Sequence, residues 1–152
     1  MTFVDWLGAY AFASWAGKSL PTEDEWMLAA LGSRRLPPST VTYPWGDQAP
    51  DSSRANYISG RAAPSLHAVA SYPAGATPTQ LSDMVGNVAE WTLSEEKTAL
   101  SAGKEDTWIV VKGGSFLDAG SQLSLTKRSL RRRDERLGSL GFRCIVREGT
   151  SR

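Results

Sequence analysis

Cysteine, histidine and long apolar runs are scarce in this 152-residue chain, which has 1 cysteine and 1 histidine. The lone Cys144 cannot form a disulfide within the chain, so the covalent staple of many small secreted domains is absent and a reducing compartment is permitted. No stretch approaches the roughly 20 apolar residues that cross a bilayer, and Met1 is not followed by the charged and apolar segments of a signal peptide. These absences argue against membrane association and leave the compartment open.

A strong net charge is also lacking. Lys and Arg number 17 against 16 Asp and Glu, so the chain as a whole has no field that would gather nucleic acid, and we expect no nucleic-acid partner. The length is that of a single domain, residues 1–152, which can bury one core. What the chain does have is 6 Trp and 14 Gly, a composition typical of a loop-rich domain in which large rings pack against tight turns.

Two helices are predicted near the start of the chain. In residues 4–18 apolar side chains recur at helical spacing, Asp5 can cap the start and Gly17 can end the helix. In residues 22–32, Thr22 and Glu25 form a Thr-x-x-Glu capping box and Gly32 stops the helix.

Loops and then strands follow these helices. Residues 33 to 80 are punctuated by Pro, Gly, Ser and Asp, and a stretch of that length needs an anchor, either aromatic side chains such as Trp45 and Tyr57 or a bound ion. Strand-like runs occur at 107–116 and 140–148, whereas the acids at 95, 96, 105 and 106 are expected in a solvated loop. This order of elements predicts an α+β domain.

Six ordered motifs give the chain a resemblance to a known family: VDWLGAYAFASWAGKSLPTEDEWMLAALG, YPWGD, ANY, DMVGNVAEWT, VKGGSF and LGFRC. In this order and at these spacings they resemble the formylglycine-generating enzyme family, also called the sulfatase-modifying factor family. The resemblance implies a C-type lectin-like fold with two helices, a small twisted antiparallel sheet and abundant loop. It also implies one domain over residues 1–152 that lacks the N-terminal part of the family domain. Fold is implied more firmly than chemistry, since related domains include enzymes and ligand-binding proteins.

The resemblance implies a calcium site in the DMVGNVAEWT segment. The matching positions are the carboxylates of Asp83 and Glu90 and the carbonyls of Gly86 and Val88, and a bent backbone suits a cation that takes six to eight oxygens. The alternative is a simple turn in which Asp83 bonds a local amide and Glu90 is solvated. A second family site would use Asn56 and the Tyr57 carbonyl, but residues 58–75 contain no Asp or Glu, so we expect that site to be lost.

The family's redox chemistry lacks its ligands here. Formylglycine-generating enzymes hold copper(I) with two cysteine thiolates after the GGS motif, and the matching positions are Asp118 and Leu123. Cys144 matches a cysteine of the final strand and is expected to be a buried small side chain. The related sulfoxide synthases need iron held by three histidines, and His67 alone is expected to be an incidental surface residue. We therefore expect neither copper nor iron.

The segment between the GGS and GFR motifs, residues 115–140, is the remaining candidate for function. It lies where the enzymes of this fold place their active centre and where the diversified binding proteins place their variable surface. One interpretation is a surface that grips a carboxylate or phosphate, with candidate ligand-binding residues Asp118, Lys127, Arg128, Arg132 and Arg133. The alternative is internal ion pairing, which is favoured for Arg131 and Arg136.

The sequence thus predicts a catalytically silent module that binds a protein or a small anionic ligand. An enzyme of unrecognised chemistry in the same cleft and a regulatory domain that anchors an effector remain as alternatives. The final strand, at 142–148, is expected to present an unpaired edge, because the family strand that covers it lies upstream of Met1. We expect either that a second copy or a partner subunit covers it, or that the chain is the C-terminal part of a longer protein. The alternative is that residues 147–152 or part of the 93–106 loop fold back over the edge.

Overall fold

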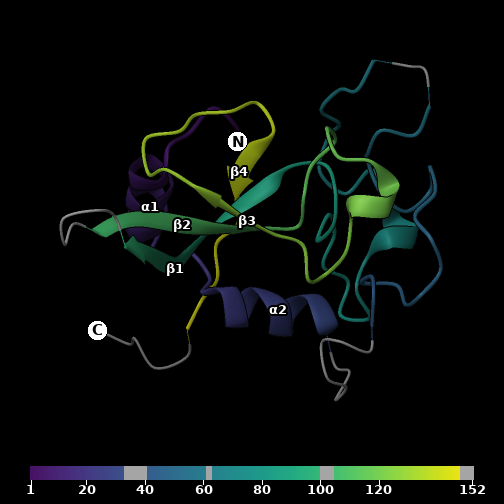
Figure 1. The fold of residues 1–152 in the computed structure, drawn as a ribbon. Coiled ribbons are helices and arrows are strands. Elements are labelled where there is room, and N and C mark those ends of the chain that lie inside the picture. The colour runs from purple at the N-terminus through teal and green to yellow at the C-terminus, as the bar shows by residue number, and fades with distance from the viewer. Residues whose placement is uncertain (33–40, 61–62, 100–104, 148–152) are drawn as a thin grey trace.

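The computed structural model describes residues 1–32, 41–60, 63–99 and 105–147, which form two helices, four strands and connecting loops (Figure 1). The helices are α1 (Trp6–Trp15) and α2 (Glu23–Leu31). The strands are β1 (Ala89–Ala99), β2 (Glu105–Lys112), β3 (Arg128–Arg131) and β4 (Leu140–Phe142). Single 3-10 turns occur at Pro73–Gly75 and Gly120–Gln122. The predicted α+β class is confirmed.

Both helices begin at the predicted caps. The Asp5 side chain accepts a hydrogen bond from the Gly8 amide at 2.8 Å. In α2, Thr22 Oγ1 accepts from the Glu25 amide at 3.2 Å, while Glu25 Oε2 accepts from the Thr22 amide at 2.7 Å, so the capping box is complete. Gly32, with φ of 64°, follows α2 in the left-handed region that favours glycine.

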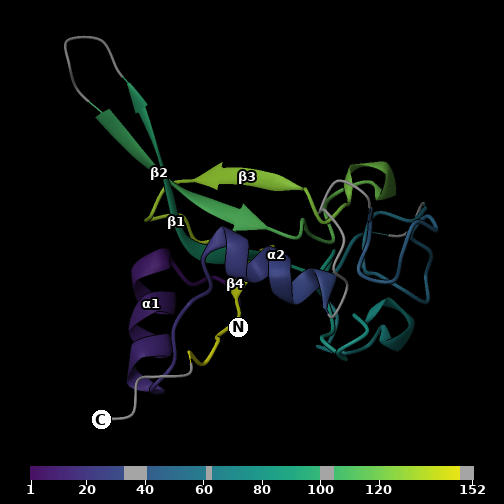
Figure 2. The ribbon, with the colours of Figure 1, turned by 90° about the horizontal axis from the view of Figure 1, so that it is seen from below.

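The four strands form one mixed sheet in the order β3-β2-β1-β4. The β1–β2 and β2–β3 pairs are antiparallel, but β1 and β4 run parallel. The resemblance implied an antiparallel sheet, and the observed sheet is mixed. The C-terminal end of β1 and the N-terminal end of β2 extend beyond strands β3 and β4 (Figure 2). The expected solvated loop at 95, 96, 105 and 106 is wrong, because these positions pair across the β1–β2 hairpin.

The C-terminal strand is shorter than predicted, and the chain itself covers its edge. Strand β4 ends at Phe142 instead of residue 148. Gly141 pairs with β1 on one side and forms an antiparallel bridge with Thr2 on the other. Ser19 and Ile145 exchange two backbone hydrogen bonds, at 3.0 and 2.8 Å. The expectation of a bare strand at 142–148 is therefore wrong; residues 148–152, one of the expected covers, lie outside the described residues.

Two apolar clusters form the core. One joins α1 to the sheet and includes Trp6, Ala9, Ala13, Leu20, Trp91, Ile109, Val111 and Leu140. The other lies under α2 and the loops and includes Trp26, Ala30, Leu31, Val41, Tyr43, Met84, Leu123 and Leu125. The described loops between residues 41 and 80 gather at the side of the molecule away from α1 (Figure 1). Aromatic anchors hold them, because the rings of Tyr43 and Trp45 stack at 5.0 Å and the Tyr57 hydroxyl donates to the Pro50 carbonyl.

The outer face of α1 is apolar and exposed. This 10-residue helix, WLGAYAFASW, contains no charged side chain, and only Trp6, Ala9 and Ala13 are buried against the sheet. Leu7 and Trp15 are 61% and 82% exposed, and Tyr10 and Phe12 are also exposed. A helix that is apolar all round is normally covered on more than one face. No helix among the described residues is long and apolar enough to cross a bilayer.

Candidate functional site

The loop after the GGS motif closes on Asp118. Its Oδ1 accepts a hydrogen bond from Lys127 Nζ at 2.8 Å, and its Oδ2 accepts one from the Ser115 amide at 2.8 Å. Burial raises the pKa of the Asp118 carboxyl, but Lys127 and the Ser115 amide outweigh burial, so the pKa lies below its ordinary value. The carboxylate is therefore ionised and already paired inside the protein.

Asp118 and Leu123 lie close together, both beside Gly114. A Cβ at Gly114 would come within 3.2 Å of Asp118 Oδ2 and 2.8 Å of a Leu123 methyl. Leu123 is 1% exposed and packs in the cluster under α2. These two positions, which the resemblance assigns to copper thiolates, thus hold an ion-paired carboxylate and a core side chain, and neither is a soft ligand for copper(I).

Cys144 packs against a different core cluster from the one that contains Leu123. It contacts the cluster between α1 and the sheet. Burial raises the pKa of the thiol, only partly offset by Lys18, so the thiol is protonated at neutral pH and is a poor nucleophile or metal ligand. The side chain is half-buried, close to the buried position that the sequence predicts.

The predicted basic residues are each paired with an acid of the same chain. Arg128 lies 3.1 Å from Glu23 and 2.5 Å from Glu96. Arg132 lies 3.3 Å from Asp106, and Arg133 pairs with Glu95. Arg131 and Arg136 also form the internal pairs favoured from the sequence, with Glu135 and Asp5. The geometry therefore favours internal ion pairing along the whole segment.

The five candidate ligand-binding residues do not form one patch. Asp118 and Lys127 pair with each other, and Arg128 lies over the start of α2. Arg132 and Arg133 line a hollow of about 410 Å³ with Asp106, Thr107 and Asp134. Their guanidinium groups lie over aromatic rings, Arg132 5.7 Å from Trp108 and Arg133 5.0 Å from Trp6. Both arginines border this hollow, which is therefore the candidate anion-binding part of the 115–140 surface.

The predicted calcium segment is bent as expected. Gly86 and Asn87 have φ of 80° and 59°, and a Cβ at Gly86 would come within 2.5 Å of the Asn56 carbonyl. Asp83 Oδ2 accepts from the Ala70 amide at 2.7 Å, 13 positions away, so this bond is not the local one of the simple-turn alternative. That alternative also placed Glu90 in solvent, whereas Glu90 is 5% exposed. Val88 and Asp83 border a cavity of about 250 Å³.

Glu90 is buried and already faces a cation. Arg143, from the GFR motif, donates to both carboxylate oxygens at 2.6 and 2.7 Å, and Trp26 Nε1 donates at 2.7 Å. Arg143 also donates to the Ser82 carbonyl at 3.1 Å. No group of three or more His, Cys, Asp or Glu gathers within the described ranges. The residues therefore fit a guanidinium better than a calcium ion, which takes several oxygens around it, and calcium binding stays a prediction.

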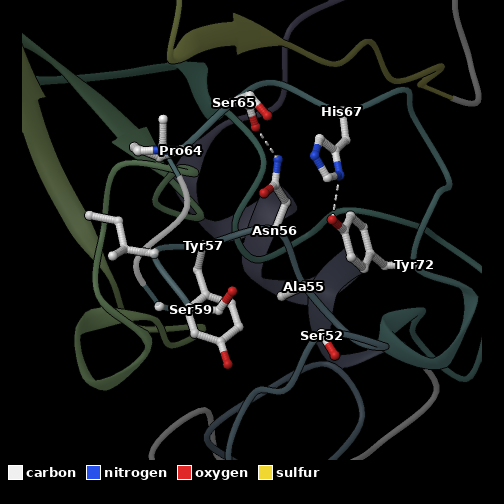
Figure 3. Close-up of a pocket in the computed structure, with 12 residues that line it drawn as sticks. Ser52, Ala55, Asn56, Tyr57, Ser59, Pro64, Ser65, His67 and Tyr72 are labelled. Atoms are coloured by element: carbon white, nitrogen blue, oxygen red, sulfur yellow. Dashed lines mark hydrogen bonds between the residues drawn. The ribbon is translucent and has the colours of Figure 1, made fainter.

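Two other polar pairings in the structure were not predicted from the sequence. His67 is exposed as expected, but its Nδ1 lies 2.5 Å from the Tyr72 hydroxyl, at the wall of a cavity (Figure 3). Lys112 is 2% exposed, lies 5.6 Å from the Trp26 ring and pairs with Glu23 at 3.3 Å. Neither pairing has a local sequence signal, because Lys112 and Glu23 stand 89 positions apart. The five-residue spacing of His67 and Tyr72 fits no regular element.

Comparison with known protein families matches residues 1–148 to the sulfatase-modifying factor enzyme 1-like domain. The chain therefore belongs to the formylglycine-generating enzyme, or sulfatase-modifying factor, family. It is 35% identical over 161 residues to inactive C-alpha-formylglycine-generating enzyme 2 of Bos taurus, covering 96% of this chain and 50% of that protein. It is 36% identical over 166 residues to the formylglycine-generating enzyme of Mycobacterium tuberculosis, covering 91% and 54%. The chain thus spans about half the length of these relatives.

The chain is also similar to an enzyme with a different name, hercynine oxygenase. Hercynine oxygenase of Mycolicibacterium thermoresistibile is 43% identical over 96 residues, which cover 60% of this chain and 20% of that protein. Among solved structures, CarF superposes with a TM-score of 0.72 at 25% identity, over 94% of this chain and 66% of that one. PvdO from Pseudomonas aeruginosa superposes with a TM-score of 0.71 at 20% identity, over 93% and 59%. These likenesses confirm the fold that the motifs implied.

Proposed function

We propose that this domain is a catalytically silent member of its family that acts by binding a ligand or a protein. The observation that carries the proposal is the pair of positions beside Gly114, Asp118 and Leu123. Asp118 is ion-paired to Lys127, and Leu123 is packed in the core. Copper(I) favours thiolates, and the single cysteine of the chain belongs to a different cluster of the core. The name of the bovine relative, an inactive formylglycine-generating enzyme, supports the same conclusion.

Catalytic silence is tested by incubating the purified protein with copper(I), oxygen and a cysteine-containing peptide. The formylglycine-generating enzyme of Mycobacterium tuberculosis serves as the positive control. We expect no peptide aldehyde by mass spectrometry and copper(I) binding no tighter than that of an Asp118→Ala variant. Aldehyde formed by this chain would overturn the proposal and favour the alternative of an enzyme in the same cleft.

The binding surface proposed within residues 115–140 is the hollow between Arg132 and Arg133. Both arginines are fixed over aromatic rings, and both are ion-paired at the surface. Exposed pairs of this kind contribute only about 0–1 kcal/mol, so a carboxylate or phosphate of a partner can replace Asp106 or Glu95. Arginine is suited to this exchange because its planar group binds such oxyanions through two parallel hydrogen bonds.

An NMR titration with a glutamate-rich peptide tests this surface. We expect saturable shifts of backbone amides in 106–108 and 132–134. The Arg132→Gln/Arg133→Gln double variant is expected to lose them, whereas Arg136→Gln, which removes a cation of the same segment outside the hollow, is expected to keep them. Equal binding by both variants would show that the hollow is not the contact surface. Capture of a specific protein partner that needs neither arginine would favour the alternative of an anchoring domain.

A further inference from the structure

A second cavity, separate from the arginine hollow, lies in the loop region beside Asn56. Its volume is about 460 Å³, within the range of small-molecule sites. Tyr57 and Ser59 stand on one side, His67 and Tyr72 stand on the other, and Asn56 lies between them (Figure 3). Among the described residues that line it, none is Asp, Glu, Lys or Arg.

Asn56 presents a fixed hydrogen-bond acceptor to this cavity. The residue is 7% exposed, and its amide nitrogen donates to the Ser65 carbonyl at 2.8 Å and to Asn87 Oδ1 at 3.0 Å. These two bonds use both N–H groups and set the orientation of the amide. Within the part of the chain that the structure describes, Asn56 Oδ1 accepts no hydrogen bond. Every solvent-inaccessible side-chain oxygen there has a hydrogen-bond partner, so Oδ1 is not one of the inaccessible atoms. The oxygen is therefore open to the cavity.

His67 presents a second polar group, from the wall that it forms with Tyr72. Its ring stacks on Tyr72 with centroids 5.8 Å apart and planes at 8°, and Nδ1 is taken by the Tyr72 hydroxyl. Burial, and then Asp83, raise the pKa of Tyr72, so the hydroxyl stays protonated. The other ring nitrogen, Nε2, faces the side on which Asn56 lies (Figure 3). It is a donor or an acceptor depending on the direction of the His67–Tyr72 bond.

We propose that this cavity binds a small molecule in which an N–H donor and a carbonyl acceptor are attached to a flat ring. The donor would bond Asn56 Oδ1, the acceptor or a second donor would bond His67 Nε2, and the ring would lie between the aromatic walls. The inference is independent of catalytic silence and of the arginine hollow.

Nicotinamide and its N,N-dimethyl derivative test the acceptor role of Asn56 without altering the protein. Both have the same ring and carbonyl, but only nicotinamide has N–H groups. We expect saturable binding of nicotinamide in the millimolar range, as is common for a fragment of this size. Shifts of the amides at 56–58, 65–67 and 72 should accompany it. The dimethyl derivative should bind at least about fivefold more weakly, since one hydrogen bond is lost.

Two variants test the role of His67. His67→Phe keeps a ring against Tyr72 but removes both nitrogens, and we expect about fivefold weaker binding of nicotinamide. Tyr72→Phe removes the hydroxyl and leaves Nε2 in place, so binding should stay within about twofold. Thermal melting of both variants shows whether they are folded; because both side chains lie at the cavity wall and not in the two core clusters, little loss of stability is expected.

Four results would overturn the proposal. The first is equal affinity for the two amides, and the second is tighter binding of nicotinic acid than of nicotinamide, which would indicate an anion site. The third is a set of shifts that saturates with calcium at lower concentration, which would indicate a cation site at Asn56. The fourth is the absence of saturable shifts at these amides up to about 50 mM nicotinamide.

Discussion

Arg143 and Glu90 form a buried two-bond ion pair, with Nε 2.6 Å from Oε2 and Nη2 2.7 Å from Oε1. The two residues stand 53 positions apart in the chain, and they join the loop after β4 to the start of β1. Burial disfavours the charged guanidinium, but Glu90 outweighs this effect, so the pKa of Arg143 is raised. The Glu90 carboxylate therefore stabilises the charge of Arg143 in the folded protein.

Arg143→Met is expected to destabilise the fold by about 3–5 kcal/mol, because it leaves the Glu90 carboxylate buried without its cation. Urea unfolding monitored by tryptophan fluorescence measures this loss. Arg131→Met is the matched control, since Arg131 pairs with Glu135 at the surface, and it should cost about 1 kcal/mol or less. Equal losses in the two variants would contradict a special role for the buried pair.

Calcium is expected to raise the melting temperature if the predicted site is formed by Asp83, Gly86, Val88 and Glu90. An ion that binds only the folded state contributes about 2.7 kcal/mol at a hundredfold excess over its dissociation constant. Asp83→Asn should remove the effect, and asparagine tolerates the φ of 56° at this position. Melting that is unchanged by both calcium and chelator would leave Arg143 as the cation of this segment and would refute the calcium site.

Acid is expected to remove the stabilisation that Glu25 provides. The Arg147 hydrogen bond, helped by the amide and hydroxyl of Thr22, prevails over burial and lowers the pKa of Glu25 from 4.5 to about 2. A lowered carboxyl pKa contributes stability that is complete above pH 4.5 and is lost as the pH falls towards 2. Glu25→Gln should therefore flatten the dependence of unfolding free energy on pH between these values. An unchanged slope in the variant would contradict the assignment.

Lys112→Met is expected to keep or raise stability, by up to about 1 kcal/mol. Burial is the main cause of the lowered pKa of Lys112, with Glu23 acting in the opposite direction, so charging this lysine is costly in the folded state. Methionine has a similar volume and can pack against Trp26, while Glu23 keeps its contact with Arg128. Lys112→Ala, which leaves a cavity, should destabilise by about 2–4 kcal/mol. A loss of that size in Lys112→Met would show that the buried charge stabilises the fold.

Local patterns predicted the elements that local chemistry determines. The Asp5 cap and the Thr22–Glu25 capping box each involve residues within one helical turn, and both helices begin where these motifs place them. Strand β3 was not predicted, because RSLR has no apolar alternation and is a strand through its pairing with β2. Likewise β1 continues through the charged residues Glu95 and Glu96 because β2 supplies its hydrogen bonds.

The site was less predictable than the fold, because its interactions join distant parts of the chain. The arginines of 128–136 form a basic run in the sequence, yet most of their acids come from the N-cap of α1, from α2 and from the β1–β2 hairpin, for example Asp5, Glu23 and Glu95. Asn56 and His67 are linked through Asn87, which bonds both segments. No spacing rule connects such residues, so the sequence could identify Asn56 only through the family resemblance.

The charge-free outer face of α1 makes ionic strength a means of telling one contact surface from another. An association that buries Leu7, Tyr10 and Trp15 involves no charge of that helix, so about 1 M salt should leave it intact or strengthen it. An association through Arg132 and Arg133 should weaken over the same range, because the Debye length falls to about 3 Å. A second copy or another subunit held by α1 would therefore stay bound in a sedimentation experiment at high salt, whereas a partner held by the arginine hollow would be released.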